Sequence, residues 1–315
     1  MGLRVGVIGV GHLGRHHARI YAEMEGVELT GVVDADRVRA GDIARQYGSR
    51  AYTDFREALD GLQALSIATP TSTHYAIALE CLRAGKDLLI EKPITLTVRE
   101  ADELIEEAQK RGLILQVGHI ERYNPAVVAL FRLAAGDSKI AGATCPIAEG
   151  HALFEAERVS PFKGRAGDVD VTLDLMIHDI DIILGLTRAK VTSLSAAGVS
   201  AVTDKIDYAK AWLEFENGST AVITASRISE DTKRALRIWQ KGSSIIADCL
   251  KPEVKIYTGL STETVPLEMK EPLKEELLDF AACVIERRRP KVSGVEARDA
   301  LELAIKITER IKERL

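Results

Sequence analysis

Asp174, His178 and Asp181 are spaced i, i+4 and i+7 within an otherwise apolar stretch, residues 169–186. At helical periodicity this spacing places the three side chains on one face. A histidine with an ordinary pKa of about 6.5 can accept a hydroxyl proton near neutral pH, and a carboxylate one turn away can orient its ring. The spacing also fits a solvated Asp–His stripe, or a divalent ion held by these groups. We favour acid–base chemistry without a metal, because the stretch has no second histidine.

Lys92 is a second candidate for the same chemistry. It lies in Glu91-Lys92-Pro93 after an apolar run at residues 87–90, and the proline keeps it out of the α conformation. A lysine held at the carboxyl end of a parallel strand faces the edge where ligands bind. It can donate to the oxygen that loses a proton and stabilise the developing alkoxide. Lys92 and His178 can exchange the roles of base and polarising group.

A glycine-rich turn near the start of the chain predicts a nucleotide site. The apolar run at residues 4–8 leads into G-x-G-x-x-G at residues 9–14, a pattern of strand, tight turn and helix start. The first glycine permits the turn, the second lets the backbone approach a diphosphate, and the third lets the helix pack closely. Taken alone, the motif also fits a turn that binds nothing. The predicted contacts are Gly9, Gly11, His12, Leu13 and Gly14.

Asp34 follows a β-rich run, residues 27–33, and lies at the spacing from the glycine turn where a carboxylate can accept both hydroxyls of an adenosine ribose. It would repel the 2′-phosphate of NADP, so we expect NAD as the cofactor. The nearby Arg37 keeps specificity for both NAD and NADP possible. The segments that follow the predicted strands at residues 64–68 and 87–90 reach the same edge of the sheet. They add Thr69, Pro70, His74, Glu91 and Lys92 to the predicted cofactor site.

The order of elements predicts two domains. Up to about residue 120, strands alternate with helices at residues 12–24, 37–46, 75–84 and 98–111, which is typical of a doubly wound parallel sheet. Beyond it, β runs dominate at about 140–154, 190–199, 206–216, 219–229, 235–240, 243–249 and 253–257, around helices at 126–135, 169–186, 273–288 and 294–314. We therefore predict a Rossmann-type α/β domain at residues 1–120 and an α+β domain with a mostly antiparallel sheet at residues 121–315.

Composition narrows the class of protein. The net charge of −5 over 315 residues gives no general basic field for nucleic acid or an anionic membrane. No apolar stretch approaches the roughly 18 residues of a membrane span, and the first apolar run is too short for a signal peptide. The four cysteines form no C-x-x-C pair, which favours free thiols in a reducing cytoplasm.

The ordered set of motifs resembles the glucose-fructose oxidoreductase and inositol dehydrogenase family (Gfo/Idh/MocA), and the resemblance covers nearly the whole chain. It implies an N-terminal Rossmann domain, a C-terminal domain with a large open sheet, and a nicotinamide cofactor in the cleft between them. It also implies a cis bond before Pro93 and a dimer or tetramer packed through the sheet. The catalytic lysine of the family maps onto Lys92, and its aspartate and histidine map onto Asp174 and His178.

The segment Gly118-His119-Ile120-Glu121-Arg122-Tyr123-Asn124-Pro125 resembles family members that oxidise the 3-hydroxyl of UDP-N-acetylglucosamine. Arg122 can meet a diphosphate and Asn124 a sugar hydroxyl, but a salt bridge at a domain junction explains Arg122 equally well. Arg165 is another anion-binding candidate. The predicted substrate residues are Lys92, Arg122, Tyr123, Asn124, Arg165, Asp174 and His178.

The expected function is NAD-dependent oxidation of a sugar or nucleotide sugar. The alternatives are a dehydrogenase of inositol or a free sugar, an NAD-binding regulator without catalysis, and a metal-dependent hydrolase. The presence of Lys92, Asp174 and His178 argues against the regulator, because a binding module has no need for an acid–base pair.

Overall fold

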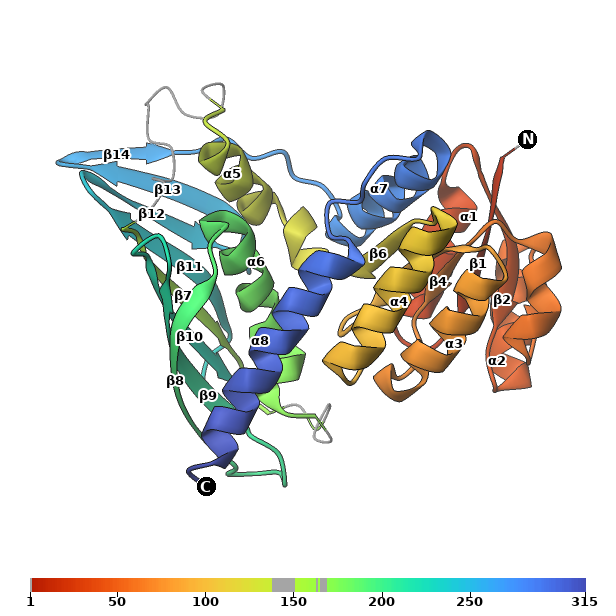
Figure 1. Cartoon of the computed structure of the whole chain (residues 1–315). Helices are drawn as coiled ribbons and strands as arrows, with labels where there is room; N and C mark the ends of the chain where they lie inside the picture. Colours follow the sequence, from red (N-terminus) through yellow and green to blue (C-terminus); the bar gives the residue numbers. More distant parts are fainter. Residues whose placement is uncertain (1, 138–150, 163, 165–168) are drawn as a thin grey trace. The chain divides into compact units, whose positions relative to one another are not determined.

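The structure is a computed structural model that describes residues 2–137, 151–162, 164 and 169–315 (Figure 1). The chain forms two compact units: Met1–Ile120 with Leu273–Arg298, and Glu121–Pro272 with Asp299–Leu315. Residues 273–298 thus pack with the first unit rather than with the residues that precede them in the sequence. The reason is the apolar face of helix α7 (Pro272–Glu286), which buries Leu277 and Phe280 in the core of the first unit.

The first unit contains a six-stranded, all-parallel sheet in the order β3-β2-β1-β4-β5-β6. Its strands are β1 (Leu3–Ile8), β2 (Val27–Val33), β3 (Arg50–Tyr52), β4 (Ala64–Ile67), β5 (Asp87–Glu91) and β6 (Leu115–Gly118). The helices between them are α1 (Gly14–Glu23), α2 (Arg37–Tyr47), a 3₁₀ helix (Phe55–Gly61), α3 (Thr71–Arg83) and α4 (Val98–Arg111). The Rossmann-type prediction is confirmed. The strand order reverses between β1 and β4, where such sheets bind ligands at their carboxyl ends.

Local sequence signals explain where these helices begin and end. Helix α2 begins after Asp36, whose carboxylate accepts the N–H groups of Val38 and Arg39. Helix α4 begins with a capping box between Thr97 and Glu100, and it ends at Gly112 in the left-handed conformation. Helix α3 begins at Thr71, four residues earlier than predicted, so that the hydroxyl-rich segment forms its first turn.

The second unit contains an eight-stranded sheet in the order β14-β13-β12-β11-β7-β10-β9-β8. All neighbouring pairs are antiparallel except β7 with β10, so the predicted mostly antiparallel sheet is confirmed. The strands are β7 (Leu153–Val159), β8 (Val191–Val199), β9 (Tyr208–Phe215), β10 (Thr220–Ser226), β11 (Lys233–Gln240), β12 (Ser243–Asp248), β13 (Glu253–Thr258) and β14 (Ser261–Thr264). The β run expected at 140–154 falls largely outside the described residues, and β7 overlaps it only at residues 153–154.

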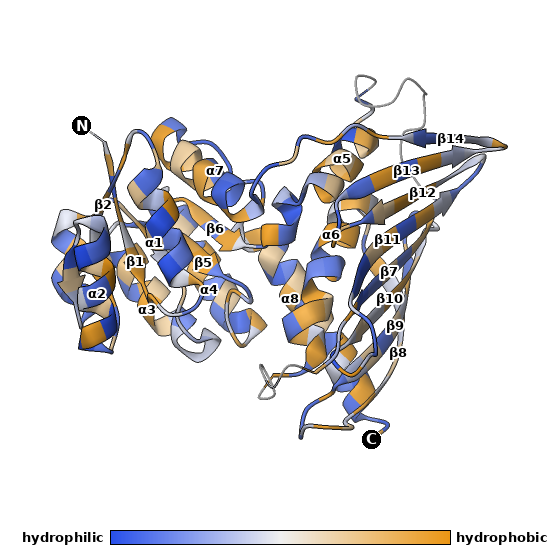
Figure 2. Ribbon diagram, turned by 180° about the vertical axis from the view of Figure 1, so that it is seen from behind, coloured by the Kyte–Doolittle hydropathy of each residue, from blue (hydrophilic) through white to orange (hydrophobic). Residues whose placement is uncertain are grey.

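Helices cover one face of this sheet (Figure 1). They are a 3₁₀ turn (Ile120–Tyr123), α5 (Pro125–Ala134), a π-helical turn (Thr172–Met176), α6 (Ile177–Thr187) and the later part of α8 (Gly294–Lys312). Burial alternates along β9, as expected for a sheet with one packed face. The other face exposes Trp212 and Trp239, and hydrophilic and hydrophobic residues mix along the strands (Figure 2).

A helix that spans a membrane must be both long and apolar. No helix within residues 2–137, 151–162 or 169–315 meets both requirements.

Candidate active site

The glycine turn between β1 and α1 has the geometry of a diphosphate cradle. Gly9 adopts a φ of +84°, and a Cβ atom on Gly14 would lie 1.7 Å from the carbonyl oxygen of Gly9. Both positions therefore require glycine for the turn itself. A Cβ on Gly11 would meet no atom within 4 Å, so this glycine leaves space beside the amino end of α1. The N–H groups of a helix start and an unobstructed backbone fit a bound diphosphate.

Asp34 directly follows β2, and both of its carboxylate oxygens accept hydrogen bonds. Its oxygens accept the N–H groups of Val10 at 3.1 Å and of Asp36 at 2.9 Å. The guanidinium of Arg39 donates to both oxygens, at 3.1 and 3.2 Å, and also bonds Asp36. Arg39 rather than the expected Arg37 is thus the cation next to the predicted ribose site. The sequence could have indicated this role of Arg39, because a residue three positions after the helix cap Asp36 lies next to it on the helix surface.

Lys92 directly follows β5, at the carboxyl end of the sheet, and the Lys92-Pro93 bond is cis, as the family resemblance implies. The ring of His74 lies within hydrogen-bonding distance of the carbonyl oxygens of Thr69, at 2.9 Å, and Pro93, at 3.0 Å. Burial lowers the pKa of His74, so that the neutral ring donates to one carbonyl at a time. His74 therefore ties the segment after β4 to the segment after β5.

Glu91 was expected to contact the cofactor, but in the structure its side chain forms a hydrogen bond with His17 of the first unit. Oε1 accepts a hydrogen bond from Nε2 of His17, at 3.1 Å, and both side chains are buried. The cofactor contacts expected for Thr69, Pro70, His74 and Glu91 stay predictions. His17 is a residue that the sequence reading missed.

Asp174 and His178 lie one turn apart in the second unit, but the helix there is not uniform. Asp174 belongs to the π-helical turn, and His178 lies in the first turn of α6. Single π turns inside α-helices occur often at functional sites. Asp174 is half-buried and His178 is 9% exposed, which leaves the imidazole little contact with solvent.

The i+7 spacing predicts that Asp181 shares a helix face with Asp174 and His178, but its carboxylate pairs with Arg122. Its carboxylate accepts Nε of Arg122 at 2.6 Å and Nη2 at 3.0 Å, and both side chains are buried. A Cβ on Gly185 would lie 2.5 Å from this guanidinium, so the arginine also packs against the backbone of α6. The salt-bridge explanation therefore accounts for Arg122 fully, and Asp181 is its partner.

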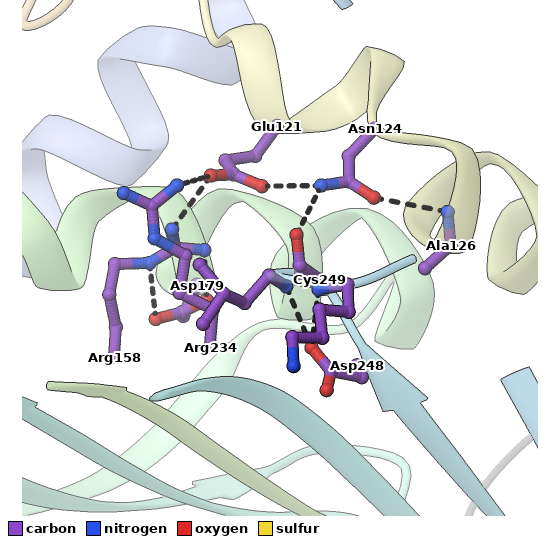
Figure 3. Close-up of polar contacts among 10 residues, drawn as sticks. Glu121, Asn124, Ala126, Arg158, Asp179, Arg234, Asp248 and Cys249 are labelled. Atoms are coloured by element: carbon purple, nitrogen blue, oxygen red, sulfur yellow. Dashed lines mark hydrogen bonds and ion pairs between the residues drawn. The ribbon is translucent and has the colours of Figure 1, made fainter. Parts of the chain in front are cut away.

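A second buried ion network surrounds the 3₁₀ turn (Figure 3). The Glu121 carboxylate accepts Arg158 at 2.8 Å and Arg234 at 3.1 Å, and Arg158 also binds both oxygens of Asp179. Burial lowers the pKa of Arg158, but Asp179 and Glu121 outweigh it and raise the pKa above its ordinary value. Burial raises the pKa of Asp179 even so, because Arg158 offsets only part of the lost hydration.

Two further predicted substrate residues are buried beside this network. The Asn124 amide donates to Glu121 and to the carbonyl oxygen of Cys249, and its oxygen accepts the N–H of Ala126 as the cap of α5. Tyr123 is 3% exposed. Arg165 lies outside the described residues. The structure thus explains Asn124 by packing within the second unit, and it leaves the substrate roles of all three residues as predictions.

Comparison with known proteins identifies the family. A model described as an oxidoreductase family with an NAD-binding Rossmann fold matches residues 3–119, and a Gfo/Idh/MocA C-terminal domain model matches residues 152–245. The UDP-N-acetylglucosamine 3-dehydrogenase of Acidithiobacillus ferrooxidans is 39% identical over 97% of this chain and 96% of its own. The chain belongs to the Gfo/Idh/MocA oxidoreductase family. The resemblance found in the sequence is confirmed.

Other relatives in the family differ in substrate. An NAD⁺-dependent scyllo-inositol 2-dehydrogenase of Bacillus subtilis is 31% identical over 97% of this chain and 93% of its own. A solved structure of the A. ferrooxidans enzyme has a TM-score of 0.91 at 40% identity and covers 99% of both chains. A levoglucosan dehydrogenase bound to NADH has a TM-score of 0.86 at 18% identity, covering 99% of this chain and 98% of its own, and supports the fold alone.

Proposed function

We propose that this Gfo/Idh/MocA oxidoreductase is an NAD-dependent dehydrogenase that oxidises the 3-hydroxyl of UDP-N-acetylglucosamine. The observation that carries the proposal is the similarity to the A. ferrooxidans enzyme, which extends over nearly the full length of both chains. The chain also has the residues that the chemistry needs, namely Lys92, Asp174 and His178. An inositol dehydrogenase is the second candidate, because the B. subtilis relative covers almost as much of the chain.

Each of the three residues has a distinct role in this proposal. A bound nicotinamide supplies the hydride acceptor. His178 takes the hydroxyl proton, and Asp174, one turn earlier, orients the imidazole and stabilises its charged form. Lys92 donates to the same oxygen and stabilises the negative charge that develops there. Lys92 and His178 can exchange these roles.

NAD rather than NADP is the proposed cofactor. The carboxylate of Asp34 is fixed by two backbone N–H groups at the end of β2. A ribose diol can donate to this carboxylate, whereas a 2′-phosphate would bring a like charge against it. Arg39 neutralises part of that charge, and the diol would therefore compete with Arg39 for the Asp34 oxygens.

This proposal assigns substrate recognition to fewer residues than the sequence predicts. We assign Arg122 and Asn124 to the packing of the second unit, because their polar groups already bond Asp181, Glu121 and Cys249. Arg165 keeps its proposed role in binding the diphosphate of a nucleotide sugar.

A homo-oligomer formed through the large sheet and a cytoplasmic location complete the proposal. The uncovered sheet face carries exposed Trp212 and Trp239, large apolar side chains that favour association. Within the described residues, Cys81, Cys249 and Cys283 are buried free thiols, which fits a reducing compartment.

The test is a substrate screen with the purified full chain. NADH formation at 340 nm is followed with NAD and either UDP-N-acetylglucosamine, UDP-glucose or myo-inositol, and repeated with NADP. We expect UDP-N-acetylglucosamine to give the largest kcat/KM. Oxidation of myo-inositol alone would support the second candidate, and the absence of NADH formation with every compound would contradict the proposal.

A further inference from the structure

A buried hydrogen bond lies directly beside Lys92. His17, in the second turn of α1, is fully buried, and its Nε2 donates to Oε1 of Glu91, the last residue of β5. The same carboxyl group packs against the end of β6, where a Cβ on Gly118 would lie 3.0 Å from Oε2. The Glu91 side chain is therefore held from two sides, and the next residue in the chain is Lys92.

Electrostatics in this part of the first unit favour an ionised Glu91. Burial raises the pKa of Glu91, but the hydrogen bond from His17 and the positive charge of Lys92 outweigh it and hold the pKa below its ordinary value.

The other acid that faces Glu91 is Glu276 of α7. It is fully buried, and neither of its carboxyl oxygens has a hydrogen-bond partner among the described residues. Burial and the charge of Glu91 raise the pKa of Glu276 well above its ordinary value. Of these two buried carboxyl groups, Glu91 is therefore the one that loses its proton at lower pH, one residue before Lys92.

The residue after Lys92 is also anchored. The ring of His74, in α3, lies between the carbonyl oxygens of Pro93 and Thr69, within hydrogen-bonding distance of each, and donates to one of them at a time. Lys92 therefore lies between two points held by buried histidines, His17 from α1 and His74 from α3. Of these two helices, α1 is the one that starts at the glycine turn.

We infer that His17 is a positioning residue which, through Glu91, fixes Lys92 relative to the helix that binds the cofactor diphosphate. The inference rests on the proposed function, since it takes Lys92 as the group that polarises the substrate oxygen. A displacement of about 1 Å at a reacting group can cost roughly 100-fold in rate. Loss of the His17–Glu91 bond should accordingly slow the chemical step while the glycine turn still binds NAD.

The test compares His17→Leu and His17→Gln with Tyr21→Phe as the control. Tyr21 is one turn further along α1, is equally buried, and loses a comparable bond, from its hydroxyl to Ser66 at 2.8 Å. We expect His17→Leu to lower kcat at least about tenfold, with a larger primary deuterium isotope effect and an NADH Kd within about threefold of wild type. His17→Gln, whose amide can donate to Glu91, should recover most of the rate, and Tyr21→Phe should keep it.

Glu91→Gln provides a second variant if His17→Leu does not fold. It keeps the shape of the side chain and weakens the bond to His17, so the same loss confined to kcat is expected. An unchanged kcat in folded His17→Leu or Glu91→Gln overturns the inference. So does a loss of kcat that merely follows a loss of NADH affinity, or a failure of His17→Gln to recover activity.

A measurement without substrate separates this inference from the proposed function. Acetylation of lysines in the NADH complex is followed by mass spectrometry for wild type and His17→Leu. Lys92 should react at least about threefold faster in the variant because its backbone is less restrained, while exposed Lys110 reacts equally in both. Equal rates at Lys92 contradict the inference even if none of the sugars is oxidised, whereas inactive wild type with faster Lys92 labelling contradicts only the proposed function.

Discussion

The two units hold their candidate catalytic residues by different physical means. In the first unit, Lys92 follows a strand whose end is fixed by backbone geometry and by single bonds from His17 and His74. In the second unit, His178 lies in a helix whose first two turns carry two buried, doubly bonded ion pairs, Asp179 with Arg158 and Asp181 with Arg122.

This difference predicts different responses to substitution. A single hydrogen bond typically contributes about 0.5–1.5 kcal/mol, or about 1.5–3 kcal/mol when one group is charged, so losing one shifts a residue without unfolding the unit. Removing one member of a buried ion pair leaves an uncompensated charge and costs about 3–5 kcal/mol. Changes around His178 should therefore act mainly on stability, and changes around Lys92 mainly on rate.

The largest effect is expected at Arg158. Arg158→Met leaves Asp179 without its arginine and leaves Glu121 with the half-exposed Arg234 and the Asn124 amide, so the free energy of unfolding should fall by about 3–5 kcal/mol. The matched control is Arg237→Met in β11, which removes more exposed bonds to glutamates and should cost less than about 1 kcal/mol. Urea unfolding measures both, and equal losses would contradict the distinction.

Arg122 separates a structural role from a substrate role. Arg122→Met should lower the free energy of unfolding by about 3 kcal/mol, and adding Asp181→Leu should restore much of it because no buried charge is then left alone. A substrate role predicts a stable variant with a raised KM. Chemical unfolding of both variants, together with the KM of the double variant, distinguishes the two roles.

The glycine turn provides a pair of substitutions with opposite outcomes. Gly14→Ala places a methyl group against the carbonyl of Gly9 and should cost about 1–3 kcal/mol of stability. Gly11→Ala meets open space and should leave the melting temperature unchanged, yet weaken NAD binding at least about tenfold by occupying the diphosphate cradle. Calorimetric titration with NAD checks the second outcome. An unaltered affinity in Gly11→Ala would mean that the diphosphate does not bind at this turn.

Glu276→Gln should stabilise the protein, and more so as pH rises. Because its pKa is raised, folded Glu276 keeps its proton above about pH 4.5 while the unfolded chain releases it, which costs wild type about 1.4 kcal/mol per pH unit. Glutamine removes this cost. Urea unfolding at pH 5 and pH 7 should show an advantage that grows with pH, and an advantage that does not change would mean that Glu276 titrates normally.

The sequence predicted what depends on local pattern. The glycine turn, the position of Asp34 after β2 and the strand before Lys92 follow from short-range spacing, and the structure places each at the carboxyl end of the parallel sheet. The antiparallel sheet followed in the same way from its β runs.

What the sequence did not predict depends on long-range pairing. Arg122 bonds Asp181 across 59 positions and Gln116 bonds the backbone of Glu276 across 160, so neither contact has a local signal. For the same reason, the packing of α7 with the first unit was missed. The sequence did not predict the π turn at Asp174, because its hydrogen bonds span only one residue more than those of an α turn.

The most direct test of the proposed chemistry is the turnover of Lys92→Met and His178→Asn on the hydroxyl that wild type oxidises. We expect kcat to fall about 100- to 10,000-fold in each variant, with the Kd for NADH within about threefold of wild type. Full turnover in both variants with normal cofactor binding would contradict the assignment of Lys92 and His178 as the groups that move the proton.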